Sequence, residues 1–89
     1  MRSPIIHGVD IAKMQEQKDK LGYNYKIIGS RTEIYYSGIS SRMQGYRPWE
    51  LDKLTKVLSC LKLKPEDVFT DKAMLQHYKR ELAYLEESE

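Results

Sequence analysis

The stretch SGISSRMQGYRPWEL, residues 37–51, carries the signals that end one helix and begin the next. Ile39 and Met43 are four residues apart, so they share one face of a helix that we predict over residues 36–44. Gly45 suits the left-handed residue that closes a helix, and Pro48 suits the first turn of the following one. The polar and aromatic side chains that this arrangement is expected to expose are Ser40, Ser41, Arg42, Gln44, Tyr46 and Arg47.

Two helices are predicted before this stretch. Apolar residues spaced among charged ones indicate a helix over residues 10–21, after which a glycine acts as a stop signal. Asn24 can then cap a short second helix that runs to about Thr32, because its side chain can accept a hydrogen bond from a free backbone amide. Ile27 and Ile28 are expected to supply the buried face of that helix.

Two helices and a short helical turn are predicted after it. Leucines at three-four-three spacing, starting at Leu51, indicate the clearest helix of the chain. Pro65 opens a short turn that carries two apolar residues inward, and a last amphipathic helix is predicted over residues 71–87. Strand-like composition occurs only at EIYY, residues 33–36, which is too short and too isolated to build a sheet. We therefore predict an all-α domain.

The length of the chain indicates a single domain, and its charged residues are unevenly distributed along the sequence. Eighty-nine residues suffice for one domain, which we take to span residues 1–89 with a core over residues 10–69. Residues 1–62 hold eleven Lys and Arg against six Asp and Glu, whereas residues 63–89 hold four against seven. A basic front part with an acidic tail favours a body that binds a polyanion while its tail points away.

Several protein classes are disfavoured by the composition. No run approaches the roughly 18 apolar residues of a membrane span, and the opening residues lack a secretion signal, so we expect a cytoplasmic protein. Cys60 is the single cysteine, and His7 and His77 have no metal-ligand spacing, so we expect no disulfide, metal or cofactor. No nucleophile stands with a base and no glycine-rich phosphate loop occurs, so an enzyme is not expected.

The order of these elements resembles the helix-turn-helix family of phage lambda repressor and Cro. The resemblance covers residues 10–69, and its most specific pieces are GISSRMQGYRP and LTKVLSCLKLKPEDVF. It implies a compact five-helix DNA-binding domain, to which residues 71–87 add a C-terminal amphipathic helix. Ile28 and Gly29 then fall at the family's buried pair in the second helix, where a small residue lets the second and third helices cross closely.

At three positions the chain departs from the family's pattern. Glu33 stands where relatives usually have glycine with positive φ, so either Glu33 takes a strained backbone or the turn differs in shape. Arg42 occupies a position that is normally apolar, and Met43 is expected to supply that contact instead, unless the register of the third helix is off by one. Tyr25 replaces a glutamine that grips a phosphate in many relatives.

The resemblance also implies which residues contact DNA, because the major groove admits an α-helix whose side chains read base edges. The residues of this expected interface are Asn24, Tyr25, Lys26, Tyr36, Ser37, Ser40, Ser41, Arg42, Gln44, Tyr46 and Arg47. Gln44 is expected to pair with adenine, and Arg42 to read guanine or to hold a phosphate. Tyr46 and Arg47 are expected to hold the sugar-phosphate backbone.

Two functions remain open at this point. The first is a sequence-specific transcriptional regulator of phage or mobile-element type, such as a repressor, that binds double-stranded DNA as a homodimer. The alternative is a protein-interaction or antitoxin-like module of the same fold that binds its partner through Tyr35, Tyr36 and Tyr46. We expect the last helix to pack within its own chain, with dimerisation near it, because its heptad-like spacing lasts under two repeats.

Overall fold

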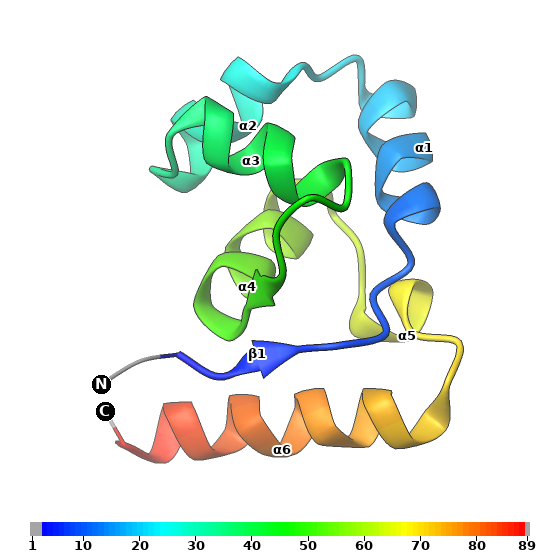
Figure 1. Ribbon diagram of the computed structural model, residues 1–89, viewed down its shortest axis with the longest axis vertical. Helices are drawn as coiled ribbons and strands as arrows, with labels where there is room; N and C mark the ends of the chain where they lie inside the picture. The colour runs from blue at the N-terminus through cyan, green and yellow to red at the C-terminus, as the bar shows by residue number, and fades with distance from the viewer. Residues whose placement is uncertain (1–2, 89) are drawn as a thin grey trace.

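The computed structural model describes residues 3–88, which form six helices and one two-stranded sheet (Figure 1). The helices are α1 (Ile11–Leu21), α2 (Tyr25–Thr32), α3 (Tyr36–Met43), α4 (Leu51–Cys60), α5 (Pro65–Val68) and α6 (Lys72–Ser88), and the strands are β1 (Ile5–Ile6) and β2 (Trp49–Glu50). Each predicted helix is present, and the predicted turn at Pro65 is the short helix α5, so the fold is mostly helical.

The starts of α1 and α2 follow from their capping residues. Asp10 accepts a hydrogen bond from Lys13 N at 3.1 Å, and Asn24 accepts one from Ile27 N at 2.8 Å. Each cap satisfies a backbone amide that the first turn of a helix leaves without a partner. The corner after α3 contains the left-handed Gly45, with φ of 86°, as the sequence predicted.

The α2 and α3 helices approach closely at a glycine. A Cβ atom on Gly29 would lie 2.6 Å from the carbonyl oxygen of Ile34, so the chain that leads into α3 passes where a side chain would stand. Glu33 has φ of 61° and ψ of 28°, the left-handed conformation that costs a non-glycine residue roughly 1–2 kcal/mol. Of the two alternatives for Glu33, the strained backbone is the one observed. Ile34 N donates to Gly29 O at 3.1 Å and completes the turn.

The buried face of α2 is narrower than the sequence suggested. Ile28 is fully buried, and Gly29 and Thr32, which lie one and four positions further along the helix, are buried as well. Ile27 was expected in the core beside Ile28, but its side chain is 37% exposed. A helix turns by about 100° per residue, so Ile27 points away from the face that Ile28 and Thr32 share.

The hydrophobic core receives side chains from every helix and from both strands. Ile28, Ile39 and Met43 are fully buried and join α2 and α3 to the rest of the molecule. Trp49 is 3% exposed and belongs to the same core. The other buried apolar residues are Ile6, Met14, Leu51, Leu54, Val57, Leu58, Leu61, Val68, Phe69 and Tyr78.

A short sheet corrects the expectation of a purely helical domain. The strands β1 and β2 pair antiparallel, with Ile5 opposite Glu50 and Ile6 opposite Trp49. The contact continues beyond the two strands, because Leu51 N donates a hydrogen bond to the carbonyl oxygen of Pro4 at 2.9 Å. Two-residue strands are too short to show an alternating pattern, so they could not be predicted from the sequence. The pairing holds β2 beside the start of α4.

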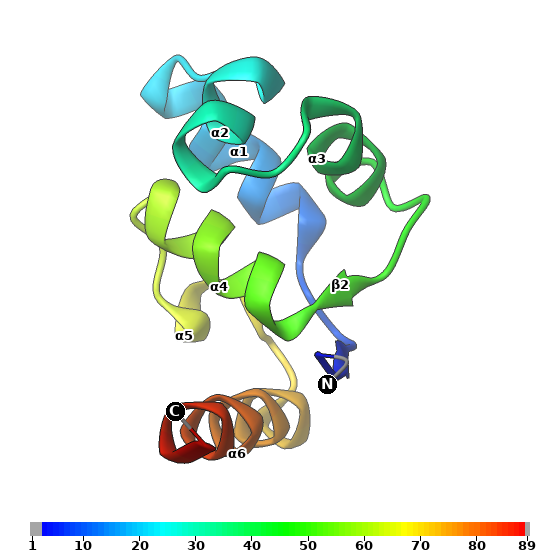
Figure 2. The ribbon, with the colours of Figure 1, turned by 90° about the vertical axis from the view of Figure 1, so that its left-hand side faces the viewer.

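The last helix, α6, lies at the opposite end of the molecule from α2 and α3 (Figures 1 and 2). Asp71 accepts a hydrogen bond from Ala73 N at 2.8 Å at the start of the helix. The buried Tyr78 fixes α6 to its own chain, because its ring centroid is 5.4 Å from that of Phe69 and its hydroxyl is 3.0 Å from Thr55 Oγ1. Helix α6 is thus held at the end of the molecule that is remote from α3 (Figure 1).

Candidate nucleic-acid interface

The face of α3 opposite the buried Ile39 carries uncharged polar side chains, and we call it the outward face. Its members are Ser37, Ser40 and Ser41 of α3 together with the cap residue Gln44. Their spacings of three and four residues put them on one side of the helix. Ser37 and Gln44 are exposed, whereas Ser40 and Ser41 are half-buried. A short helix with an open polar face has the dimensions that the DNA major groove admits.

Two hydrogen bonds order the outward face. Gln44 Nε2 donates to Ser40 Oγ at 2.7 Å, and Ser41 Oγ donates to the carbonyl oxygen of Ser37 at 2.9 Å. The Gln44 amide keeps its carbonyl oxygen and one N–H proton for another partner, while Ser41 Oγ keeps lone pairs. The face can therefore both donate and accept hydrogen bonds without carrying a charge.

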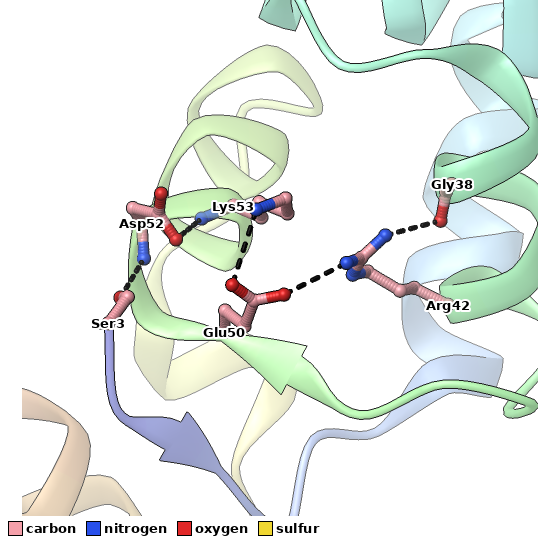
Figure 3. A network of polar contacts seen from close by, with 6 residues as sticks. All are labelled: Ser3, Gly38, Arg42, Glu50, Asp52 and Lys53. Carbon is pink, nitrogen blue, oxygen red and sulfur yellow. Dashed lines mark hydrogen bonds and ion pairs between the residues drawn. The ribbon is translucent and has the colours of Figure 1, made fainter. Parts of the chain in front are cut away.

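Arg42 was predicted to read guanine or to hold a phosphate, and its position contradicts this. Its side chain is 6% exposed and points toward β2 (Figure 3). Arg42 Nη1 donates to Gly38 O, and Nη2 donates to Glu50 Oε1, each at 3.0 Å. Met43 is fully buried as well, so both residues point inward. The cause is helical spacing, which puts Arg42 three residues after Ile39 on the buried side.

The carboxylate of Glu50 holds Arg42 in place. Its Oε1 accepts from Arg42, and its Oε2 accepts from Lys53 Nζ at 3.3 Å (Figure 3). The bond from Arg42, and then that from Lys53, lowers the pKa of Glu50 because both stabilise the carboxylate form. Arg42 is thus a structural residue whose charge is already paired within the fold.

Three predicted site residues, Asn24, Tyr25 and Lys26, lie at the start of α2. The Asn24 side chain is exposed and is used to cap the helix. Tyr25 is half-buried, and its hydroxyl oxygen accepts from Gln15 Nε2 at 3.0 Å, which leaves the hydroxyl proton to donate. Lys26 is exposed, with Nζ 5.8 Å from the ring centroid of Tyr36. Lys26 is therefore the cation that borders α3 on its α2 side.

Tyrosine rings stand exposed at both ends of α3. Tyr35 is 73% exposed, Tyr36 is 45% exposed and Tyr46 is 81% exposed. The ring centroids of Tyr35 and Tyr36 are 5.0 Å apart. Arg47, directly after Tyr46, is exposed too. Large rings with a polar tip, together with arginine, are typical of surfaces that bind another macromolecule.

Lys53 and Lys56 were not predicted as site residues, but they lie beside α3. Together with Arg47 they line a hollow between α3 and α4, whose lining also includes the acidic Glu33 and Asp52. The helical period of α4 already placed both lysines away from its buried leucines, and this was the available signal. Cations therefore border the outward face on its α4 side as well as on its α2 side.

Comparisons with known proteins identify no relative of this chain. A scan of protein-family models, a search of curated proteins and a search of solved structures each returned no match. Within residues 3–88, His, Cys, Asp and Glu side chains form no group of three that could hold a metal ion. In the same part of the chain, the helices are too short or too polar to traverse a lipid bilayer.

Proposed function

We propose that this chain is a sequence-specific DNA-binding transcriptional regulator with the fold of lambda repressor and Cro, in which α2 and α3 form the helix-turn-helix unit. The observation that carries the proposal is the outward face of α3, which is polar and open to solvent and is bordered by cations on two sides. In this arrangement α3 lies in the major groove of double-stranded DNA, and its outward side chains meet base edges.

Four cations border the proposed groove, and because Lys53 Nζ already donates to Glu50 Oε2 at 3.3 Å, the other three supply the phosphate contacts in this proposal. Lys26 borders the groove on the α2 side, and Arg47, Lys53 and Lys56 border it on the α4 side. Such contacts fix the position of the protein on the duplex without selecting a sequence. Tyr46 is exposed at the end of α3 and adds a contact to the same backbone.

We also propose that the protein binds DNA as a homodimer on paired half-sites. One copy presents only three serines and one glutamine on its outward face, which is a small contact for a specific site. Two copies double the number of base and phosphate contacts. Sedimentation of the chain with and without a duplex measures this directly, and a single copy on a full-length specific site would contradict it.

The salt dependence of duplex binding tests the proposed function. If about five phosphates are contacted, the logarithm of the affinity should fall with the logarithm of the salt concentration at a slope near −4 to −5. Arg47→Ala should reduce the size of that slope by about 1. The matched control is Arg80→Ala on α6, which removes the same charge at the other end of the molecule and should leave the slope unchanged.

A protein-interaction module is the second candidate, and the exposed tyrosines favour it. Tyr35 is 73% exposed and Tyr46 is 81% exposed, and tyrosine is one of the residues that most often anchor a protein–protein interface. In this case duplex binding is weak and indifferent to sequence, and Arg47→Ala and Arg80→Ala weaken it equally. Loss of a pulled-down protein partner in Tyr35→Ala and Tyr46→Ala variants, with duplex binding unchanged, would favour this candidate over the regulator.

A further inference from the structure

The outward face of α3 offers no free cation, and this limits which bases it can read. Within residues 36–44 Arg42 is the only basic residue, and its guanidinium is bound to Gly38 O and Glu50 Oε1. Guanine presents two acceptors, O6 and N7, in the major groove, and Arg or Lys is its commonest partner. The outward face therefore contains no Arg or Lys side chain that is free to bind guanine.

Gln44 is the one long side chain of the outward face, and Ser40 decides how its amide is presented. The amide has two N–H protons, and one of them is donated to Ser40 Oγ at 2.7 Å. The amide held in this way offers one donor and one acceptor. Adenine presents one acceptor, N7, and one donor, the N6 amino group, whereas guanine presents two acceptors. On guanine, the carbonyl oxygen of Gln44 would face O6, acceptor against acceptor.

Ser41 does not recognise guanine either, for a different reason. Its hydroxyl proton is donated to the carbonyl oxygen of Ser37 at 2.9 Å, so Ser41 Oγ can only accept from a base. The donors in the major groove are the amino groups of adenine and cytosine. Ser41 therefore adds nothing to the recognition of guanine.

We propose that each half-site carries an A·T pair at the position that Gln44 contacts, with adenine selected because Ser40 fixes the Gln44 amide. The inference rests on the proposed function, since it names the base that the same surface selects. Gln44 is the residue that touches the base in this proposal. Ser40 is a positioning residue, because it acts on the choice between adenine and guanine through Gln44.

The test begins with selection of duplexes from a random DNA pool by the full chain. The enriched site then competes with versions in which each A·T pair is replaced in turn by G·C. We expect one position at which this replacement weakens wild-type binding by about 5- to 150-fold. Gln44→Ala should abolish the difference at that position.

Two further variants separate positioning from affinity. Ser40→Ala should narrow the preference for A·T over G·C while binding to the A·T site persists, because the released amide can turn its second N–H toward guanine. Arg47→Ala should weaken both duplexes alike, because a phosphate contact does not distinguish bases. Thermal unfolding of each variant, with a midpoint close to that of the wild type, establishes that the surface change has left the fold intact.

The outcomes distinguish this inference from the proposed function. A G·C pair at the position that depends on Gln44 would overturn the inference and leave the regulator proposal standing. An A·T preference that neither Gln44→Ala nor Ser40→Ala alters would do the same. Failure to enrich any duplex would overturn both.

Discussion

Glu33 carries backbone strain in the turn between α2 and α3. Its φ of 61° lies in the left-handed region, which glycine adopts without the steric cost of a Cβ atom. We expect Glu33→Gly to raise the free energy of unfolding by about 1 kcal/mol, because relief of roughly 1–2 kcal/mol is partly offset by the greater chain entropy that glycine loses on folding. Denaturation with urea, followed by circular dichroism, measures the change.

The matched control for this change is Ser30→Gly. Ser30 is an exposed residue in α2, so glycine there should lower the free energy of unfolding by a few tenths to about 1 kcal/mol. The two substitutions therefore have opposite expected signs. A Glu33→Gly variant that is less stable than the wild type, as Ser30→Gly is expected to be, would contradict the left-handed conformation of Glu33.

Gly29 shows the reverse constraint, because here glycine cannot be replaced without a clash. A Cβ atom would lie 2.6 Å from Ile34 O and 3.4 Å from the Cα and N atoms of Tyr36. We expect Gly29→Ala to lower the free energy of unfolding by about 1–3 kcal/mol, although alanine favours a helix by about 1 kcal/mol over glycine. Thermal unfolding is the measurement, and a variant as stable as the wild type would argue against this close approach.

At the scale of elements, the ion pair between Arg42 and Glu50 connects α3 to β2. Because the pKa of Glu50 is lowered in the folded state from an ordinary value of 4.5, the pair adds stability above that pH. This contribution is lost as the pH falls through the lowered pKa. Glu50→Gln should therefore reduce the unfolding temperature near neutral pH, and the gap to the wild type should close in acid.

Thermal unfolding of both proteins from about pH 7 to about pH 3 checks this prediction. The amide of the Glu50→Gln variant has the size of the carboxylate and can still accept from Arg42, so the comparison isolates the charge. A gap that stays constant from neutral pH into acid would show that the carboxylate charge of Glu50 adds no stability through Arg42 and Lys53.

Helix positions could be predicted from the sequence because their signals are local. The caps Asp10 and Asn24 and the leucine spacing of α4 act over one or two turns. The ion pair that Arg42 forms with Glu50 could not be predicted in this way. Its partner Glu50 belongs to β2, whose position depends on pairing with β1 near the other end of the sequence.

Some residues of the candidate site could likewise be predicted from the sequence, and others could not. The outward face followed from the period of α3, since Ser37, Ser40 and Gln44 lie opposite Ile39. The lysines of α4 were missed because their role depends on the packing of α4 beside α3, which spacing within α4 does not reveal. Local periodicity therefore predicts which side of a helix is exposed, but not which neighbouring element extends that surface.

At the scale of the whole molecule, the excess of positive charge lies at the end that contains α2 and α3. Residues 25–47, which contain α2 and α3, hold four Lys and Arg against one Glu, whereas α6 at the opposite end holds three basic and three acidic residues (Figure 2). This asymmetry turns the α3 end toward a polyanion at low salt, and the effect weakens as salt screens it. The modest net charge of +2 conceals this division.

Titration of the nitrogen-labelled chain with a selected duplex, followed by its backbone amide resonances, tests most directly whether α3 is the DNA-reading element. We expect the largest shifts between residues 36 and 47, smaller ones around Lys26 and Lys56, and resonances of α6 away from any dimer contact that stay in place. Shifts concentrated on α6, or a duplex that moves α3 no more than any other helix, would contradict the proposal that the outward face of α3 binds DNA.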